Sequence, residues 1–117
     1  MQFIHSFLNY IQYEKRGSHH TVTAYEGDLK QFYNFLESNQ ISDWSRVTFR
    51  HIRQWMMNLL DAGVTARSVN RKVATLKSFF RFLLREGVLE TSPTDKISAP
   101  KIPKRLPVFV KEKEMDL

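Results

Sequence analysis

Six basic residues and no acidic one lie between Arg67 and Arg85. Short hydrogen-bonding side chains are interleaved with them: Ser68, Asn70, Thr75 and Ser78. Arginine combined with Asn, Ser and Thr is typical of contacts to phosphate oxygens and base edges. A solvated helix face usually mixes the two signs of charge, because opposite charges four residues apart stabilise a helix. Here the sequence pairs Arg67 with Arg71, and Arg81 with Arg85, so their repulsion is uncompensated and a polyanionic partner is indicated.

The element that must position these residues is a helix over residues 65–87. At 100° per residue, one side of this helix is wholly apolar, as an amphipathic helix requires. That side consists of Val69, Val73, Leu76, Phe80 and Leu83. Arg67, Arg71, Ser78 and Arg85 fall nearly opposite. The pattern therefore predicts a helix with one buried side and one basic side.

Three further helices are predicted, over residues 1–15, from Ser18 or His19 to about Ser38, and from Phe49 to about Ala62 after a Thr48 N-cap. Gly17 suits a left-handed residue after the first helix. No stretch reads as a β-strand, so the expected fold class is all-α. The side of the second helix opposite its apolar stripe carries small and polar residues: Thr23, Gly27, Lys30 and Asn34. Glycine inside a helix costs about 1 kcal/mol relative to alanine, which indicates either a tolerated weakness or the close approach of another backbone.

The composition changes after Gly87. Four X-Pro pairs between Ser92 and Pro107 exclude regular helix, and residues 99–107 read as an extended, basic, proline-rich strap. Its cations are Lys101, Lys104 and Arg105. We therefore expect a helical domain over residues 1–92 and a linker over 93–117 that leads into a further domain.

The size and charge of the chain narrow the classes of partner that it could bind. The 117 residues suit one domain plus a tail, and 42% hydrophobic residues can close a core. A formal net charge of +6 favours an anionic partner, either nucleic acid or acidic lipid. No apolar run is long enough to span a membrane, and no signal peptide is recognisable. The absence of cysteine excludes disulfides and thiolate metal sites and fits a cytoplasmic location.

The sequence offers no catalytic, cofactor or metal site. The four tyrosines lack a neighbouring cluster of Arg and His, which favours core or boundary packing for them. His19 and His20 are consecutive and cannot both face one metal from a helix. Glu26 and Asp28 diverge on a helix and so do not form a catalytic pair. The aromatic residues Trp44, Trp55, Phe79, Phe80 and Phe82 are assigned to the core.

Three stretches resemble one family. The pattern Ser18-x-x-Thr21-x-x-x-Tyr25-x-x-Asp28-Leu29-x-x-Phe32 is similar to the opening of the core-binding domain of tyrosine recombinases, or phage integrases. Residues 66–83 resemble the fourth helix of that domain, and residues 100–107 resemble its linker to the catalytic domain. The likeness is nearest to the Xer-type members and covers essentially the whole chain.

The resemblance implies a four-helix, SAM-like orthogonal bundle that forms half of a C-shaped clamp on duplex DNA. In the family the second and fourth helices lie across the major groove, and the linker crosses the DNA backbone. Carried over residue by residue, the implied contacts on the second helix are Ser18, Thr21, Thr23, Gly27 and Lys30. On the fourth helix they are Arg67, Ser68, Asn70, Arg71, Lys77 and Arg81. The linker adds Lys101, Lys104 and Arg105.

The family's chemistry uses a tyrosine nucleophile with Arg, His and Lys around the scissile phosphate, in a domain expected to follow Leu117. The chain is therefore expected to bind duplex DNA for integration and recombination without being an enzyme by itself. Other recombinase subunits are implied partners in the assembled complex, and the isolated chain is expected to be monomeric. The alternative is a helical protein-interaction module whose basic face meets an acidic partner.

Overall fold

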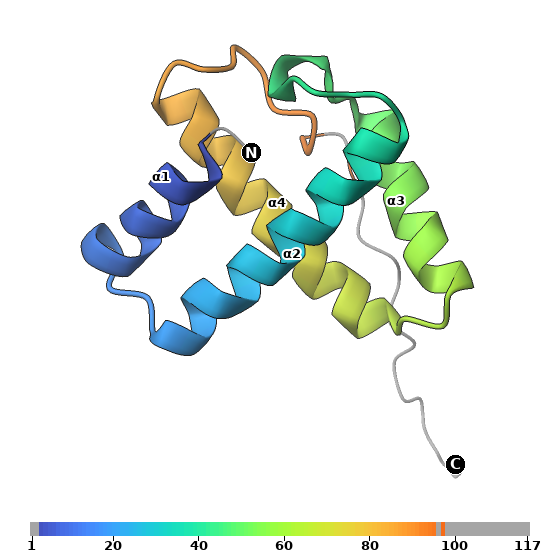
Figure 1. Cartoon of the computed structure of the whole chain (residues 1–117), viewed down its shortest axis with the longest axis horizontal. Coiled ribbons are helices and arrows are strands. Elements are labelled where there is room, and N and C mark those ends of the chain that lie inside the picture. Colours follow the sequence, from blue (N-terminus) through green and yellow to red (C-terminus); the bar gives the residue numbers. More distant parts are fainter. Residues whose placement is uncertain (1–2, 96, 98–117) are drawn as a thin grey trace, which may run out of the picture.

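The computed structural model describes residues 3–95 and 97, and these form helices joined by short loops (Figure 1). None of these residues lies in a β-strand, so the all-α prediction is confirmed. The helices are α1 (Ile4–Asn9), the π-helical turn η1 (Tyr10–Glu14), α2 (His19–Ser38), the 3-10 turn η2 (Trp44–Arg46), α3 (Phe49–Asp61) and α4 (Ala66–Arg85). In this part of the chain no helix is long and apolar enough to cross a membrane.

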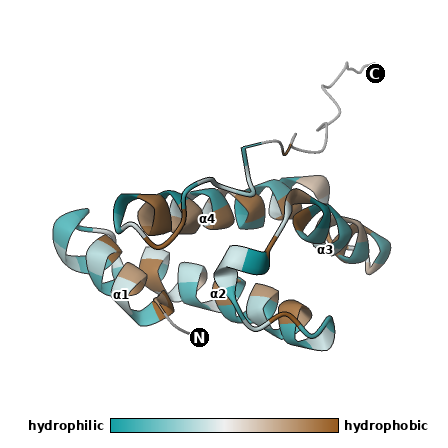
Figure 2. Cartoon of the chain, turned by 90° about the horizontal axis from the view of Figure 1, so that it is seen from above, coloured by the Kyte–Doolittle hydropathy of each residue, from teal (hydrophilic) through white to brown (hydrophobic). Residues whose placement is uncertain are grey.

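The two longest helices, α2 and α4, cross each other near their middles (Figure 1). Seen from above, α1 and α2 lie in one layer and α3 and α4 in the other (Figure 2). Helices α2 and α4 each contact all the other α-helices, so this crossing pair forms the centre of the bundle. In Figure 1 both helices begin at the bottom, α2 on the left and α4 on the right, and each ends at the top on the other side, so that they form an X.

Aromatic rings fill the space between the layers. Phe7, Phe32, Phe79 and Phe80 are completely buried. Trp44 folds back from the loop after α2 and meets Phe79 edge-on, with 4.8 Å between ring centres. Edge-to-face pairs of this kind add to the free energy gained by burying the rings. The core assignment of Trp44, Trp55, Phe79, Phe80 and Phe82 is confirmed.

Local signals in the sequence fix where the three later helices begin. Ser18 accepts a hydrogen bond from the backbone N–H of Thr21, and Thr65 accepts one from that of Ser68. Thr48 is the N-cap of α3, and its own backbone N–H donates to Nδ1 of His51 at 3.0 Å. Side chains at these positions satisfy N–H groups that have no partner inside the helix.

The first helix differs from its prediction. The α-helical part ends at Asn9, and the chain then widens into a π-turn in which Lys15 N–H bonds to the carbonyl of Tyr10. The expected left-handed role of Gly17 is wrong: Arg16 holds that conformation, with φ of 53°. Gly17 instead lies so close to Ile11 that an added Cβ would come within 2.7 Å of the Ile11 Cγ2 atom. The wide turn also leaves Tyr13 71% exposed, contrary to the packing expected of it.

After α4 the chain folds back on the bundle. The backbone N–H of Val88 donates to the carbonyl of Leu83, and Thr94 and Ile97 are buried. Burial therefore continues beyond Ser92, and the domain boundary drawn there stays a prediction. The basic strap over residues 99–107, with Lys101, Lys104 and Arg105, lies outside the described residues.

Candidate nucleic-acid interface

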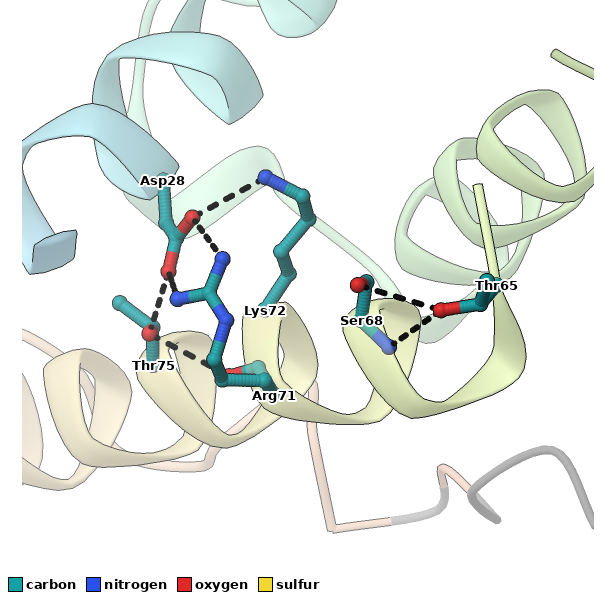
Figure 3. A network of polar contacts seen from close by, with 6 residues as sticks. All are labelled: Asp28, Thr65, Ser68, Arg71, Lys72 and Thr75. Atoms are coloured by element: carbon teal, nitrogen blue, oxygen red, sulfur yellow. Dashed lines mark hydrogen bonds and ion pairs between the residues drawn. The ribbon is translucent and has the colours of Figure 1, made fainter. Parts of the chain in front are cut away.

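At the crossing of α2 and α4, one buried carboxylate accepts hydrogen bonds from three side chains of α4 (Figure 3). Asp28 of α2 has a side chain only 4% exposed. Arg71 donates to both of its oxygens, at 2.9 and 3.3 Å, and Lys72 donates to Oδ1 at 3.1 Å. The hydroxyl of Thr75 donates to Oδ2 at 2.8 Å. Each carboxylate oxygen thus accepts two hydrogen bonds, which meets the capacity of an ionised carboxylate.

This network corrects two expectations. The charge of Arg71 is compensated by Asp28, which lies 43 residues earlier, so the uncompensated repulsion predicted for Arg67 and Arg71 is wrong. Thr75 belongs to the buried side of α4 and not to its polar face, because its side chain is fully buried against Asp28. The network also contains Lys72, which sequence reasoning did not include among the contact residues.

Two other cations of α4 lie on the opposite flank of the helix. Lys77 and Arg81 line a pocket of about 250 Å³ together with Ser92, Thr94 and Asp95. The Ser92 and Thr94 hydroxyls are 2.7 Å apart, which holds this turn together. Among the described residues, no acidic side chain forms an ion pair with Lys77 or Arg81. Both cations are therefore available to an anion that reaches this flank.

The last arginine of α4 is bound to the first helix. The guanidinium of Arg85 lies 4.7 Å from the centre of the Tyr10 ring and forms ion pairs with Glu14 at 3.6 Å and Glu86 at 4.0 Å. Arg67, at the other end of α4, is exposed and has no ion pair within the described part of the chain. The two ends of the predicted basic face therefore have different surroundings.

The remaining candidates on α4 lie close to its N-terminus. The Ser68 hydroxyl accepts a hydrogen bond from the Thr65 hydroxyl at 3.2 Å, as Figure 3 shows. Asn70 is half-buried. Ser68 thus helps to form the start of α4.

The candidates on α2 divide between two sides of that helix. Thr21 and Asp28 are seven residues apart and share one side, whereas Lys30, two residues after Asp28, lies on the other. Lys30 forms an ion pair with Glu26 at 3.3 Å between two well-exposed side chains. Thr23 and Gly27 are exposed, and Ser18 caps the helix.

Gly27 lies on an open surface. Apart from the neighbouring residues and backbone of α2 itself, no described atom lies within 4 Å of the place where a Cβ would be, so no other helix of the bundle packs against this position. Of the two explanations for this glycine, close approach of a backbone within the domain is excluded. A tolerated weakness and close approach of an external molecule both remain compatible with the surface.

A larger groove of about 820 Å³ lies elsewhere, between the η2–α3 region and residues 88–95. None of the predicted contact residues line it, and it holds none of the basic side chains of α4. Over residues 3–95 and 97 there is also no group of three or more His, Cys, Asp or Glu that could hold a metal ion. The groove therefore adds no residue to the candidate contacts on α2, α4 and the turn after α4.

Comparisons with known proteins identify the family of the chain. The family model described as "Phage integrase, N-terminal SAM-like domain" matches residues 4–87. The chain is 40% identical over 114 residues to tyrosine recombinase XerC of Oceanobacillus iheyensis, covering 97% of this chain and 37% of that protein. It is 39% identical over 110 residues to tyrosine recombinase XerC of Listeria innocua, covering 94% of this chain and 37% of that protein. The chain thus spans little more than a third of the length of these relatives. No solved structure matches it.

Proposed function

Because the chain belongs to the phage integrase N-terminal SAM-like domain family, we propose that it is the duplex DNA-binding half of a tyrosine site-specific recombinase. In this proposal the domain positions the enzyme on its recombination site, and the catalytic groups come from a further domain. The relatives named tyrosine recombinase XerC, of which this chain covers 37%, support the assignment to a recombinase.

The observation that carries the proposal is the distribution of charge on α4. Six basic residues of this helix face no acidic residue of the same helix, and only Arg71, Lys72 and Arg85 have acidic partners in the described structure. Arg67, Lys77 and Arg81 have no acidic partner among the described residues, so their charges can be neutralised by an outside partner. Phosphates provide most of the affinity of proteins for DNA, and Arg and Lys are the residues that neutralise them.

The arrangement of the helices supports a duplex over a flexible polyanion. The crossing of α2 and α4 is fixed by the bond between Asp28 and Arg71, so residues of both helices near the crossing form one rigid surface that a duplex groove can meet (Figure 1). An α-helix fits the major groove of B-DNA, where base edges can be read. The N-terminal turns of the two helices contain no acidic residue, which removes repulsion from phosphates there.

The proposed contacts are the residues assigned from the resemblance, and they serve two roles. Ser18, Thr21, Ser68 and Asn70 have hydrogen-bonding groups suited to phosphates or base edges. Positive charge comes from Lys30, Arg67, Arg71, Lys77 and Arg81. Thr23 and Gly27 are small residues, which leave room for a close approach. Lys101, Lys104 and Arg105 are proposed to contact the DNA backbone from the linker. Other recombinase subunits are the proposed protein partners of the whole enzyme.

An NMR titration of the isotopically labelled chain with a short DNA duplex, at two salt concentrations, tests the proposal. We expect shifts concentrated in residues 18–34 and 67–81 and weaker binding at the higher salt. A heparin-like polyanion and an acidic peptide serve as controls for charge alone. Equal shifts with these controls, or shifts scattered over α3, would favour the protein-interaction module and contradict the DNA-binding proposal.

A further inference from the structure

We propose that Asp28 is a positioning residue for DNA recognition, which holds the Arg71 guanidinium in place at the crossing of α2 and α4. This inference rests on the proposed function. Asp28 itself is buried and negative, so it does not touch DNA. Its role is to fix the direction of a cation that does.

The geometry of the pair is suited to this role. Arg71 donates two hydrogen bonds to the two oxygens of Asp28, and such bidentate pairs define the plane of the guanidinium. The Arg71 side chain is nevertheless 52% exposed, whereas that of Asp28 is 4% exposed. The N–H groups of Arg71 that do not bond to Asp28 therefore belong to a side chain that reaches solvent. A free arginine loses rotamer freedom when it binds a phosphate, and here folding has already ordered the side chain.

The carboxylate is itself held from the other side. Thr75 donates to Oδ2 from a fully buried position, and Lys72 donates to Oδ1 with a side chain that is 15% exposed. Asp28 therefore cannot turn to follow Arg71, and the position of Arg71 is determined by the packing of α2 on α4 (Figure 3). Two cations share one carboxylate, so one net positive charge remains at the crossing.

An alternative role for Asp28 would be purely electrostatic. In that case the carboxylate would reduce the positive potential of the surface and would weaken the binding of any polyanion. The two roles predict opposite effects of Asp28→Asn, which removes a negative charge and raises the formal net charge above +6. Simple electrostatics predicts tighter binding of DNA by this variant. Positioning predicts weaker binding despite the added positive charge.

The test is a double-mutant cycle on duplex binding with the 117-residue chain, using Asp28→Asn, Arg71→Gln and the double variant at fixed salt. Arg71→Gln is expected to weaken binding about tenfold, the loss of one hydrogen-bonded charge contact. Asp28→Asn is expected to weaken binding at least about fivefold and to lower the salt slope by about 0.9, as if one phosphate contact were lost. In the Arg71→Gln background the same substitution should change affinity less than about twofold, because its effect passes through Arg71.

Several outcomes would overturn the inference. Tighter binding by Asp28→Asn would leave only the electrostatic role, and unchanged binding would exclude Asp28 from recognition altogether. Additive losses in the cycle would indicate a general structural effect. Circular dichroism establishes that each variant is folded. If Asp28→Asn does not fold, Thr75→Val keeps every charge and removes one anchor of the carboxylate; it should weaken binding only when Arg71 is present. Failure of the unmodified chain to bind any duplex would contradict the proposed function instead.

Discussion

The guanidinium of Arg85, at the C-terminal end of α4, lies 4.7 Å from the centre of the Tyr10 ring in η1. The same side chain forms an ion pair with Glu14. A cation over an aromatic ring is attracted by the negative face of the π-system. Arg85 therefore joins the first helical segment to α4, and its surroundings differ from those of the exposed Arg67 at the other end of that helix.

Replacing Arg85 by alanine should lower stability without changing DNA binding. We expect a loss of about 1 kcal/mol in the free energy of unfolding, the sum of an exposed cation–π contact and a solvent-screened ion pair. Urea denaturation measures the stability, and duplex titration measures the affinity. A fall in the salt slope of binding in this variant would assign Arg85 to the DNA interface after all.

Arg67→Ala should have the opposite pattern. Arg67 is exposed and has no ion pair among the described residues, so its loss should leave the unfolding free energy within about 0.5 kcal/mol of the original. The salt slope of duplex binding should fall by about 0.9. Arg50→Ala, an exposed arginine on α3, is the matched control and should leave binding unchanged. Equal effects of the two substitutions would mean that α4 is not the docking surface.

Gly27→Ala separates the two explanations that remain for this glycine. A Cβ at this position meets no atom within 4 Å, so the substitution should stabilise the helix by about 1 kcal/mol. If a DNA backbone approaches here, the same substitution should weaken duplex binding while it raises the melting temperature. Unchanged affinity in a more stable variant would show that Gly27 is a tolerated weakness of α2.

Gly17→Ala should change stability in the other direction. The added Cβ would lie 2.7 Å from Cγ2 of Ile11, a buried core side chain, so the turn after η1 must shift. Overpacking of this kind costs about 1–3 kcal/mol. Thermal unfolding of the two glycine variants side by side is the measurement. Stabilisation by Gly17→Ala would mean that the contact with Ile11 is looser than the structure has it.

Asp43 should give the fold a small dependence on acid pH. Its carboxylate accepts hydrogen bonds from the backbone and side chain of Ser45, which lower the pKa of Asp43 below its ordinary value of 3.8. A lowered pKa contributes stability that is present above 3.8 and is lost as the pH falls through the folded-state value. Stability measured between about pH 5 and pH 2 should therefore decline less steeply for Asp43→Asn than for the original chain. Parallel curves would exclude this contribution.

Much of the fold is determined by local sequence. The 3.6-residue periodicity of Val69, Val73 and Leu76 predicts the buried side of α4, and the threonine caps and the glycines with positive φ set helix ends within a residue or two. These signals act over a few residues, so they can be read without knowing the packing. The first helix was less predictable, because the π-turn depends on how Ile11 and Gly17 meet the core.

The candidate site, like the fold, could be predicted only in part from the sequence. The sequence by itself determined that α4 is basic, and the family resemblance predicts contacts on α2 and α4. Only the tertiary structure decided what each cation faces. Arg71 and Lys72 are held by a carboxylate more than forty residues away, Lys77 and Arg81 line the pocket beside Ser92 and Thr94, and Arg85 is bound to Tyr10. Helical periodicity specifies the direction in which a side chain points around the axis of its own helix. Its partner depends on where another helix crosses, and that is decided by the packing of the whole core.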